Sequence, residues 1–167
     1  EVLAGGQRLL GLNDVLYRNL GRAALETAVS DLTAAGPRDA LLRRAYSALI
    51  RSLAINPLSA ATHFDLAQAL EYMRLFDLAA PEKTLDEYVK AVKLAGRDSD
   101  ILSRTGKALL ASWGSLGPED RLIVRDITRS VLALRTEERL DEILELWSLR
   151  VKDLEFMRAV LPADPAA

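Results

Sequence analysis

Residues 45–57 read AYSALIRSLAINP, and their pattern of residue sizes returns in TLDEYVKAVKLAG at residues 84–96 and in IVRDITRSVLALR at residues 123–135. Successive segments are offset by 39 residues. The repeated large, small and large positions are Leu49, Tyr88 and Ile127, then Ser52, Ala91 and Ser130, then Leu53, Val92 and Val131. Self-similarity at a fixed period of about 20–50 residues is typical of stacked helical arrays. The period predicts one packing arrangement used three times.

Amphipathic helices are predicted along the whole chain, because apolar or small residues recur every three or four positions. The predicted stripes are Leu16, Leu20, Ala24 and Thr27; Leu42, Ala45, Leu49 and Leu53; Leu66, Ala67, Leu70 and Met73; Leu85, Tyr88, Val89 and Val92; Leu102, Gly106, Leu109 and Trp113; Ile123, Ile127, Val131 and Leu134; and Leu140, Ile143, Leu144, Trp147 and Val151. A further short helix is predicted at residues 154–160. The chain contains 32 Leu and 25 Ala but only 15 Val plus Ile. This excess of good helix formers favours an all-α fold without a sheet.

Residues suited to helix ends punctuate these stripes. Gly36-Pro37 and Gly117-Pro118 place Pro in the first turn of a helix, where its missing N–H costs nothing. Thr84 and Glu87 have the spacing of a capping box. Gly96 suits a helix C-terminus. The connections are short, so consecutive helices are predicted to be antiparallel neighbours.

Composition limits the classes of function. The chain has 167 residues with 22 basic and 24 acidic side chains, and it contains no cysteine. Disulfide scaffolds, thiolate metal sites and cysteine nucleophiles are therefore excluded. A net charge of −2 without a basic stripe argues against nucleic-acid binding. No apolar run approaches the ~18–20 residues of a membrane span, so we expect no direct membrane insertion of this segment.

The repeats resemble the tetratricopeptide repeat family, whose unit is a helix–turn–helix of about 34 residues. The resemblance covers residues 12–135. The first-helix positions similar to the family pattern are Tyr17, Leu20, Gly21 and Ala24; His63, Leu66, Ala67 and Leu70; and Leu102, Thr105, Gly106 and Leu109. The second-helix positions are Ala45, Leu49, Ser52 and Pro57; Thr84, Tyr88, Ala91 and Gly96; and Ile123, Ile127, Ser130 and Arg135. The family's initial Trp is missing from every copy, and only Pro57 of its terminal prolines is present.

The resemblance implies a right-handed α-α superhelix, a TPR-like solenoid of about three helical hairpins with C-terminal capping helices. We expect a flexible lead-in at residues 1–11, one repeat domain at residues 12–161 and a tail at residues 162–167. The domain divides into repeats at residues 12–57, 58–97 and 98–135 and a cap at residues 136–161. Because the chain begins at Glu1 rather than Met, we expect a segment of a longer protein. Localisation stays open between a cytoplasmic and an extracytoplasmic soluble domain.

Three polar or aromatic features have both a structural and a functional interpretation. His63, the only histidine, precedes Asp65 by two residues, but residues two apart on a helix point about 200° apart, so packing at a repeat junction is favoured over catalysis. Asp98, Ser99 and Asp100 lack the Gly of a calcium loop, so helix capping is favoured over cation binding. Trp113 and Trp147 fall on apolar stripes, which favours core packing over a recognition role.

The concave side of such an array is lined by its first helices, and groove binding is its usual use. The residues that the family register turns inward are Arg18, Arg22, Phe64, Gln68, Glu71, Ser103 and Lys107. One aromatic residue among polar groups of both signs suits an extended peptide or a partner helix better than a small substrate. The alternative is that these side chains are only solvated.

The sequence therefore predicts a noncatalytic protein–protein interaction module that binds a peptide or partner helix in its groove, without a cofactor or metal. The alternative is a structural or oligomerisation domain of a larger bacterial membrane-anchored or cell-envelope protein, since such arrays often occur as appendages of these proteins. A homo-oligomer is compatible with either. An enzyme or small-molecule receptor is a third possibility, which no motif supports.

Overall fold

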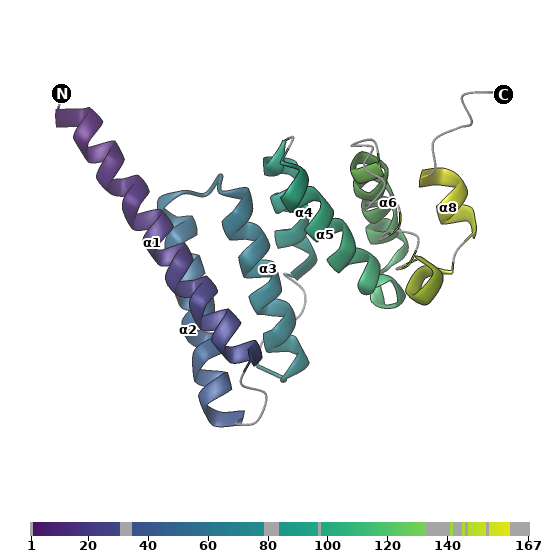
Figure 1. Cartoon of the computed structure of the whole chain (residues 1–167), viewed down its shortest axis with the longest axis horizontal. Helices are drawn as coiled ribbons and strands as arrows, with labels where there is room; N and C mark the ends of the chain where they lie inside the picture. The colour runs from purple at the N-terminus through teal and green to yellow at the C-terminus, as the bar shows by residue number, and fades with distance from the viewer. Residues whose placement is uncertain are drawn as a thin grey trace. The chain divides into compact units, whose positions relative to one another are not determined.

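The computed structural model describes residues 2–30, 35–78, 84–96, 98–132, 141, 145, 147–152 and 154–160. Every regular element in this part of the chain is helical (Figure 1). The elements are α1 (Val2–Ser30), α2 (Ala35–Ile55), α3 (Ala60–Leu75), α4 (Thr84–Ala95), α5 (Ser99–Ala111), the 3₁₀ turn η2 (Trp113–Ser115), α6 (Pro118–Leu132), the π-helical turn η3 (Trp147–Val151) and α8 (Leu154–Val160). The prediction of an all-α fold is confirmed for the described residues.

The chain divides into two compact units, Glu1–Leu94 and Ala95–Ala167. The division lies close to the predicted repeat boundary at residues 97–98. The other predicted boundary that the structure describes, at residues 57–58, falls in the short connection between α2 and α3.

In the first unit, α1 and α2 lie side by side in opposite directions, and α3 packs against both (Figure 1). Leucines and alanines from all three helices form the core, together with one methionine. These core residues are Ala24, Leu25, Ala28, Leu42, Ala45, Leu49, Leu66, Ala69, Leu70 and Met73. The small side chains let the helix backbones approach closely while the leucines fill the space between them.

Gly21 marks the closest approach of α1 to α2. A Cβ atom at this position would lie 2.7 Å from Cγ of Leu49 and 3.1 Å from the backbone oxygen of Ala45. Both distances are shorter than ordinary van der Waals contact. A side chain here would push the two helices apart, which explains why glycine is used inside a long helix despite its poor helix propensity.

The predicted buried face of α1 is wrong in part. Leu16 and Leu20 are 54% and 42% exposed, and Thr27 is also exposed, whereas Ala24 is buried as predicted. The core is instead reached by Leu25 and Ala28 together with Ala24. The cause is the close approach at Gly21, which rotates the small-residue face of α1 toward α2 and leaves the leucine face outward.

The expected lead-in at residues 1–11 also differs from the structure. α1 begins at Val2, so residues 2–11 continue the helix that contains Tyr17 and Arg18. Ala4, Leu9 and Leu10 have high helix propensity, and the two glycines Gly5 and Gly6 do not break the element. Local helix propensity therefore starts α1 before residue 12, where the resemblance to the repeat begins.

The second unit has its own apolar core, formed by α5, η2, α6, η3 and α8. Trp113 is buried, and its ring packs against Phe156 with 4.6 Å between centroids and planes at 65°. The guanidinium of Arg121 lies 5.3 Å from the Trp113 centroid, a cation–π distance. The prediction that Trp113 packs in the core is confirmed. Trp147 is half-buried at the start of η3.

Several predicted helix ends are confirmed. Pro118 begins α6, and Pro37 lies in the first turn of α2. Gly96 follows α4 with φ +58°, the left-handed conformation that favours glycine at a helix end. These helix-end signals act through the local backbone, so they do not depend on which elements the helices pack against.

Some predictions concern residues that the structure does not describe. They are the helix around Leu140, Ile143 and Leu144, part of the predicted cap at residues 136–161, the repeat boundary at residues 135–136 and the tail at residues 162–167. No helix in the described part of the chain has both the length and the apolar character that crossing a membrane requires.

Candidate functional site

α3 is the helix that organises the polar contacts of the first unit. Its N-cap is Ser59, whose hydroxyl accepts a hydrogen bond from the backbone N–H of Thr62 at 3.3 Å. All six residues from 62 to 67 are buried, including Thr62, His63 and Asp65. Because a buried polar group without a partner costs about 1–3 kcal/mol, each of these three must reach a partner on a neighbouring element.

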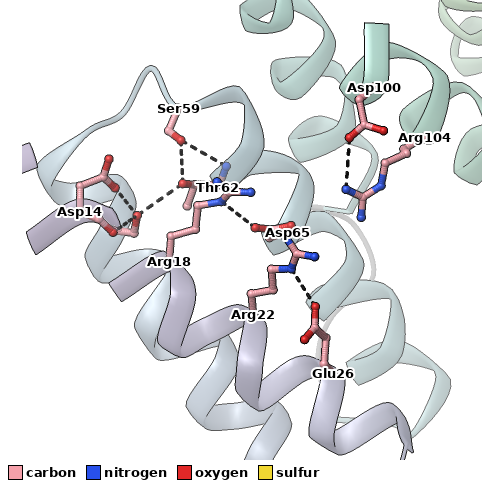
Figure 2. Close-up of polar contacts among 10 residues, drawn as sticks. Asp14, Arg18, Arg22, Glu26, Ser59, Thr62, Asp65, Asp100 and Arg104 are labelled. Atoms are coloured by element: carbon pink, nitrogen blue, oxygen red, sulfur yellow. Dashed lines mark hydrogen bonds and ion pairs between the residues drawn. The ribbon is translucent and has the colours of Figure 1, made fainter. Parts of the chain in front are cut away.

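Asp65 reaches α1. Nε of Arg18 donates to Oδ2 of Asp65 at 2.8 Å, and the Arg18 side chain is partly exposed while that of Asp65 is almost completely buried (Figure 2). Arg18 therefore neutralises a buried carboxylate and ties α1 to α3. Arg18, a predicted groove residue, is therefore partly exposed and also stabilises the contact between α1 and α3.

His63 reaches α4 and not Asp65. Nδ1 of His63 lies 2.6 Å from Oε2 of Glu87, and Nε2 lies 2.9 Å from the backbone oxygen of Pro57. The second carboxylate oxygen of Glu87 accepts from Nζ of Lys90 at 2.7 Å. His63 therefore packs where α3 meets α4, and the arrangement of a base with Asp65 as its orienting carboxylate is absent.

The predicted capping box of α4 is wrong. Glu87 does not turn back to the helix start, because its carboxylate is bound to His63 and Lys90. The hydroxyl of Thr84 is buried and makes no hydrogen bond within the described residues. A tertiary contact with a buried imidazole competes with local capping and prevails here.

Phe64 is 2% exposed, so it does not line a groove in this structure. Its ring packs against Tyr88 of α4, with 5.9 Å between centroids and planes at 56°. The hydroxyl of Tyr88 donates to Oε2 of Glu71 at 2.8 Å. The prediction that Phe64 contacts a partner is corrected: α4 covers it, and Glu71 is held from the same side.

A second polar cluster joins α1, α2 and the start of α3. Ser52 of α2 donates to the carboxylate of Asp14, and Nδ2 of Asn56 donates to the other carboxylate oxygen at 3.0 Å. The Ser52 hydroxyl also lies 3.4 Å from that of Thr62, which is 2.7 Å from that of Ser59 (Figure 2). The cluster closes one end of the α1, α2 and α3 core.

The outward surface of α1 and α3 holds the other predicted groove residues of the first unit. Arg22 is exposed, and its Nε donates to Oε1 of Glu26 at 2.7 Å, one turn later on α1 (Figure 2). Gln68 and Glu71 are half-buried on α3. We call Arg18, Arg22, Gln68 and Glu71 the outward face. These side chains carry positive, negative and amide groups and lie on two helices that share one apolar core.

Ser103 and Lys107 belong to α5 in the second unit, where both are half-buried. At the start of this helix the carboxylate of Asp98 accepts from the backbone N–H groups of Asp100 and Ile101 at 3.1 and 3.2 Å. Asp100 in turn lies 3.5 Å from Arg104 (Figure 2). The prediction that Asp98 caps a helix is confirmed.

Sequence reasoning missed Glu87 and Asp14 as buried partners. A signal for Glu87 was present, because it lies four residues before Ala91 and therefore on the buried face of the same helix. Asp14 offered a comparable signal through its register, seven residues before Gly21. Each of these two polar residues therefore shares a helix face with small or apolar residues that are buried.

The carboxylates named above are each engaged by a specific basic, hydroxyl, amide or imidazole group. Over the described residues, no group of three or more His, Cys, Asp or Glu side chains is placed to hold a metal ion. A search against protein-family models, curated proteins and solved structures found no match to this chain. We therefore infer the function from the surface of the described residues and the contacts between their side chains.

Proposed function

We propose that this chain is a noncatalytic protein-interaction module of the TPR-like type, which binds an extended peptide or a partner helix. The outward face supports the proposal, since it combines Arg22 with Gln68 and Glu71 on helices whose backbones are fixed by a close-packed core. Side chains of both signs on a rigid support can fix the register and direction of a peptide.

The pairing of successive helices supports the same proposal. α1 packs against α2 and α5 against α6, and the side chains of His63, Phe64 and Glu71 on α3 contact α4. In such a sequence of hairpins the first helices supply a common surface.

The test is selection of binding peptides from a displayed library, followed by affinity measurement with two variants. Arg22→Ser combined with Gln68→Ala changes the outward face without touching the buried carboxylate that Arg18 neutralises. Arg43→Ser combined with Arg44→Ser changes two exposed residues of α2 and serves as the control. We expect the first variant to bind about tenfold or more weakly and the control to bind normally. Equal binding by the wild type and the first variant would contradict the proposal.

A structural or oligomerisation domain of a larger bacterial membrane-anchored or cell-envelope protein is the second candidate. One observation favours it: Val15, Leu16 and Leu20 expose apolar surface along α1, with Val15 53% exposed. Adjacent exposed apolar side chains on one helix are suited to packing against another helix. Sedimentation velocity tests the self-associating form. We expect Leu16→Gln with Leu20→Gln to abolish association, and a wild type that stays monomeric at every concentration would exclude it.

A further inference from the structure

The exposed side of α2 is basic. Between residues 40 and 54 the exposed positions of this helix follow one another at spacings of three and four residues, so they form a single face. They are Ala40, Arg43, Arg44, Ser47, Ile50, Arg51 and Ala54. We call this set the arginine face. It contains three arginines and no acidic residue.

The nearest acidic residues do not neutralise the arginine face. Asp39 lies 3.8 Å from Arg38 at the start of α2, and the buried carboxylate of Asp14 is bound by a hydroxyl and an amide. Within the described ranges, no carboxylate lies at ion-pair distance from the three exposed arginines. The net charge of −2 for the whole chain therefore conceals a local positive surface.

The chemistry of this surface favours carboxylates. Its basic residues are all arginine, whose planar guanidinium binds a carboxylate through two parallel hydrogen bonds. Arg44 and Arg51 lie seven residues apart, about 10 Å along the helix axis, and on the same flank of the face. The guanidinium of Arg51 lies 5.9 Å from the ring centroid of Tyr17 on α1, a contact that helps to orient it.

The centre of the arginine face is shallow. Ala40, Ser47 and Ala54 follow one another there at intervals of seven residues. Small side chains let a second helix approach closely, and a seven-residue interval keeps two slightly inclined helices in contact over several turns. Ile50, which is 41% exposed, lies beside this line and offers one apolar contact. The shape of the face therefore suits a helix.

We propose that the arginine face docks an acidic helix of a partner protein. A small or apolar seam of that helix packs along Ala40, Ser47 and Ala54, and its glutamates, seven residues apart, pair with Arg44 and Arg51. Opposite charges beside a packed seam determine partner choice and orientation in helix pairs. The arginine face lies on a different helix from the outward face, so this docking does not depend on peptide binding there.

Two other anionic partners fit the arginine face less well. A helix that binds a membrane surface presents a broad apolar face to the lipid, whereas α2 uses its apolar face for the core. A nucleic-acid binder makes many phosphate contacts, and three arginines supply few. The acidic helix is favoured because it uses both the arginines and the line of small residues between them.

The test measures the binding of three designed helical peptides to the intact chain by fluorescence anisotropy. One peptide carries Glu at seven-residue intervals beside a seam of Ala and Leu, and the others carry Gln or Lys at the same positions. We expect the Glu peptide to bind about tenfold or more tightly than the Gln peptide, the combined effect of two or three exposed ion pairs. Raising the salt from about 50 mM to about 500 mM should remove the difference. Equal affinities at low salt would overturn the proposal.

Charge reversal separates direct pairing from damage to the fold. Arg44→Glu with Arg51→Glu should bind the Glu peptide about tenfold or more weakly and should gain binding to the Lys peptide, which a distorted protein would not do. The milder Arg43→Ser with Arg44→Ser should also weaken binding of the Glu peptide. Arg22→Ser with Gln68→Ala, on the outward face, should bind it as the wild type does. Loss of the Glu peptide only in this last variant would overturn the proposal.

Two further probes test the class of partner. They are duplex DNA and vesicles of equal parts of phosphatidylcholine and phosphatidylserine, both at the same low salt concentration. We expect each to bind the chain more weakly than the Glu peptide does. Binding of vesicles or DNA by a chain that ignores the Glu peptide would overturn the proposal of a partner helix.

Discussion

The contact between α1 and α2 and the contact between α3 and α4 lie in the same compact unit but use different residues. Gly21 and Ala45 let α1 and α2 approach until a Cβ would clash, and Leu49 fills the space that remains. α4 instead reaches α3 through His63 with Glu87 and through Tyr88 with Glu71. Close apolar packing depends on the fit of many atoms, whereas each directional polar contact depends on one pair of groups. The comparison indicates a close-packed core of α1, α2 and α3, to which α4 is attached by a few specific side-chain contacts.

The largest expected effect is at the centre of the α1 and α2 contact. Leu49 is completely buried, so Leu49→Ala should lower the free energy of unfolding of the first unit by about 2–5 kcal/mol through lost packing and a residual cavity. Urea denaturation followed by circular dichroism measures the change. Leu58→Ala, at a highly exposed position, is the matched control and should leave stability nearly unchanged. Similar losses of stability for Leu49→Ala and Leu58→Ala would show that Leu49 does not lie in the core.

The next effect tests the close approach itself. Gly21→Val should destabilise the first unit by about 1–3 kcal/mol, because its side chain must displace Leu49 or the α2 backbone. Gly36→Ala is the control, since a Cβ at Gly36 meets nothing within 4 Å. Thermal melts of the two variants give the comparison. A Gly21→Val protein as stable as the wild type would mean that α1 and α2 are further apart than described.

A smaller and more local effect is expected in the α3 and α4 contact. Tyr88→Phe removes the hydrogen bond to Glu71 and keeps the ring that packs on Phe64. The net loss should be about 0.5–1.5 kcal/mol. Exchange rates of α4 amides should rise while those of α2 amides stay the same. Equal changes in the two helices would indicate that α4 unfolds only with the core.

The smallest effect is expected on the outward face. Arg22 and Glu26 form an exposed pair one turn apart, and such pairs contribute about 0.3–0.5 kcal/mol. Arg22→Ala should therefore leave the melting temperature almost unchanged, and raising the salt concentration should remove even this difference. A marked destabilisation would show that Arg22 is structural, which would weaken its proposed role in binding.

Much of the helical architecture could be predicted from the sequence, because helix formation depends on local spacing and local end signals. Leu42, Ala45 and Leu49 mark a buried face, and Pro118 and Gly96 mark ends, without knowledge of what they contact. The same reasoning failed for Leu16 and Leu20. Periodicity shows that a helix has an apolar face, but which of two such faces is buried depends on neighbours distant in the sequence.

The candidate site was less predictable for a related reason. Phe64 and Gln68 are both compatible with a groove register, but only the tertiary position of α4 decides that Phe64 is covered. Glu87 fitted a capping box equally well, and the buried imidazole of His63 is what redirects it. Pairings between residues on different helices require the packing to be known, since no local rule fixes them.

The central claim is that α1, α2 and α3 form one cooperative core, from which α4 can open separately. Residue-resolved hydrogen exchange under native conditions tests this claim most directly. The account predicts that amides of α2 and α3 exchange only by global unfolding, while α4 amides exchange through an opening of lower free energy. If α4 amides instead show the same free energy of opening and the same denaturant dependence as those of α2, the first unit is a single cooperative block and the account is contradicted.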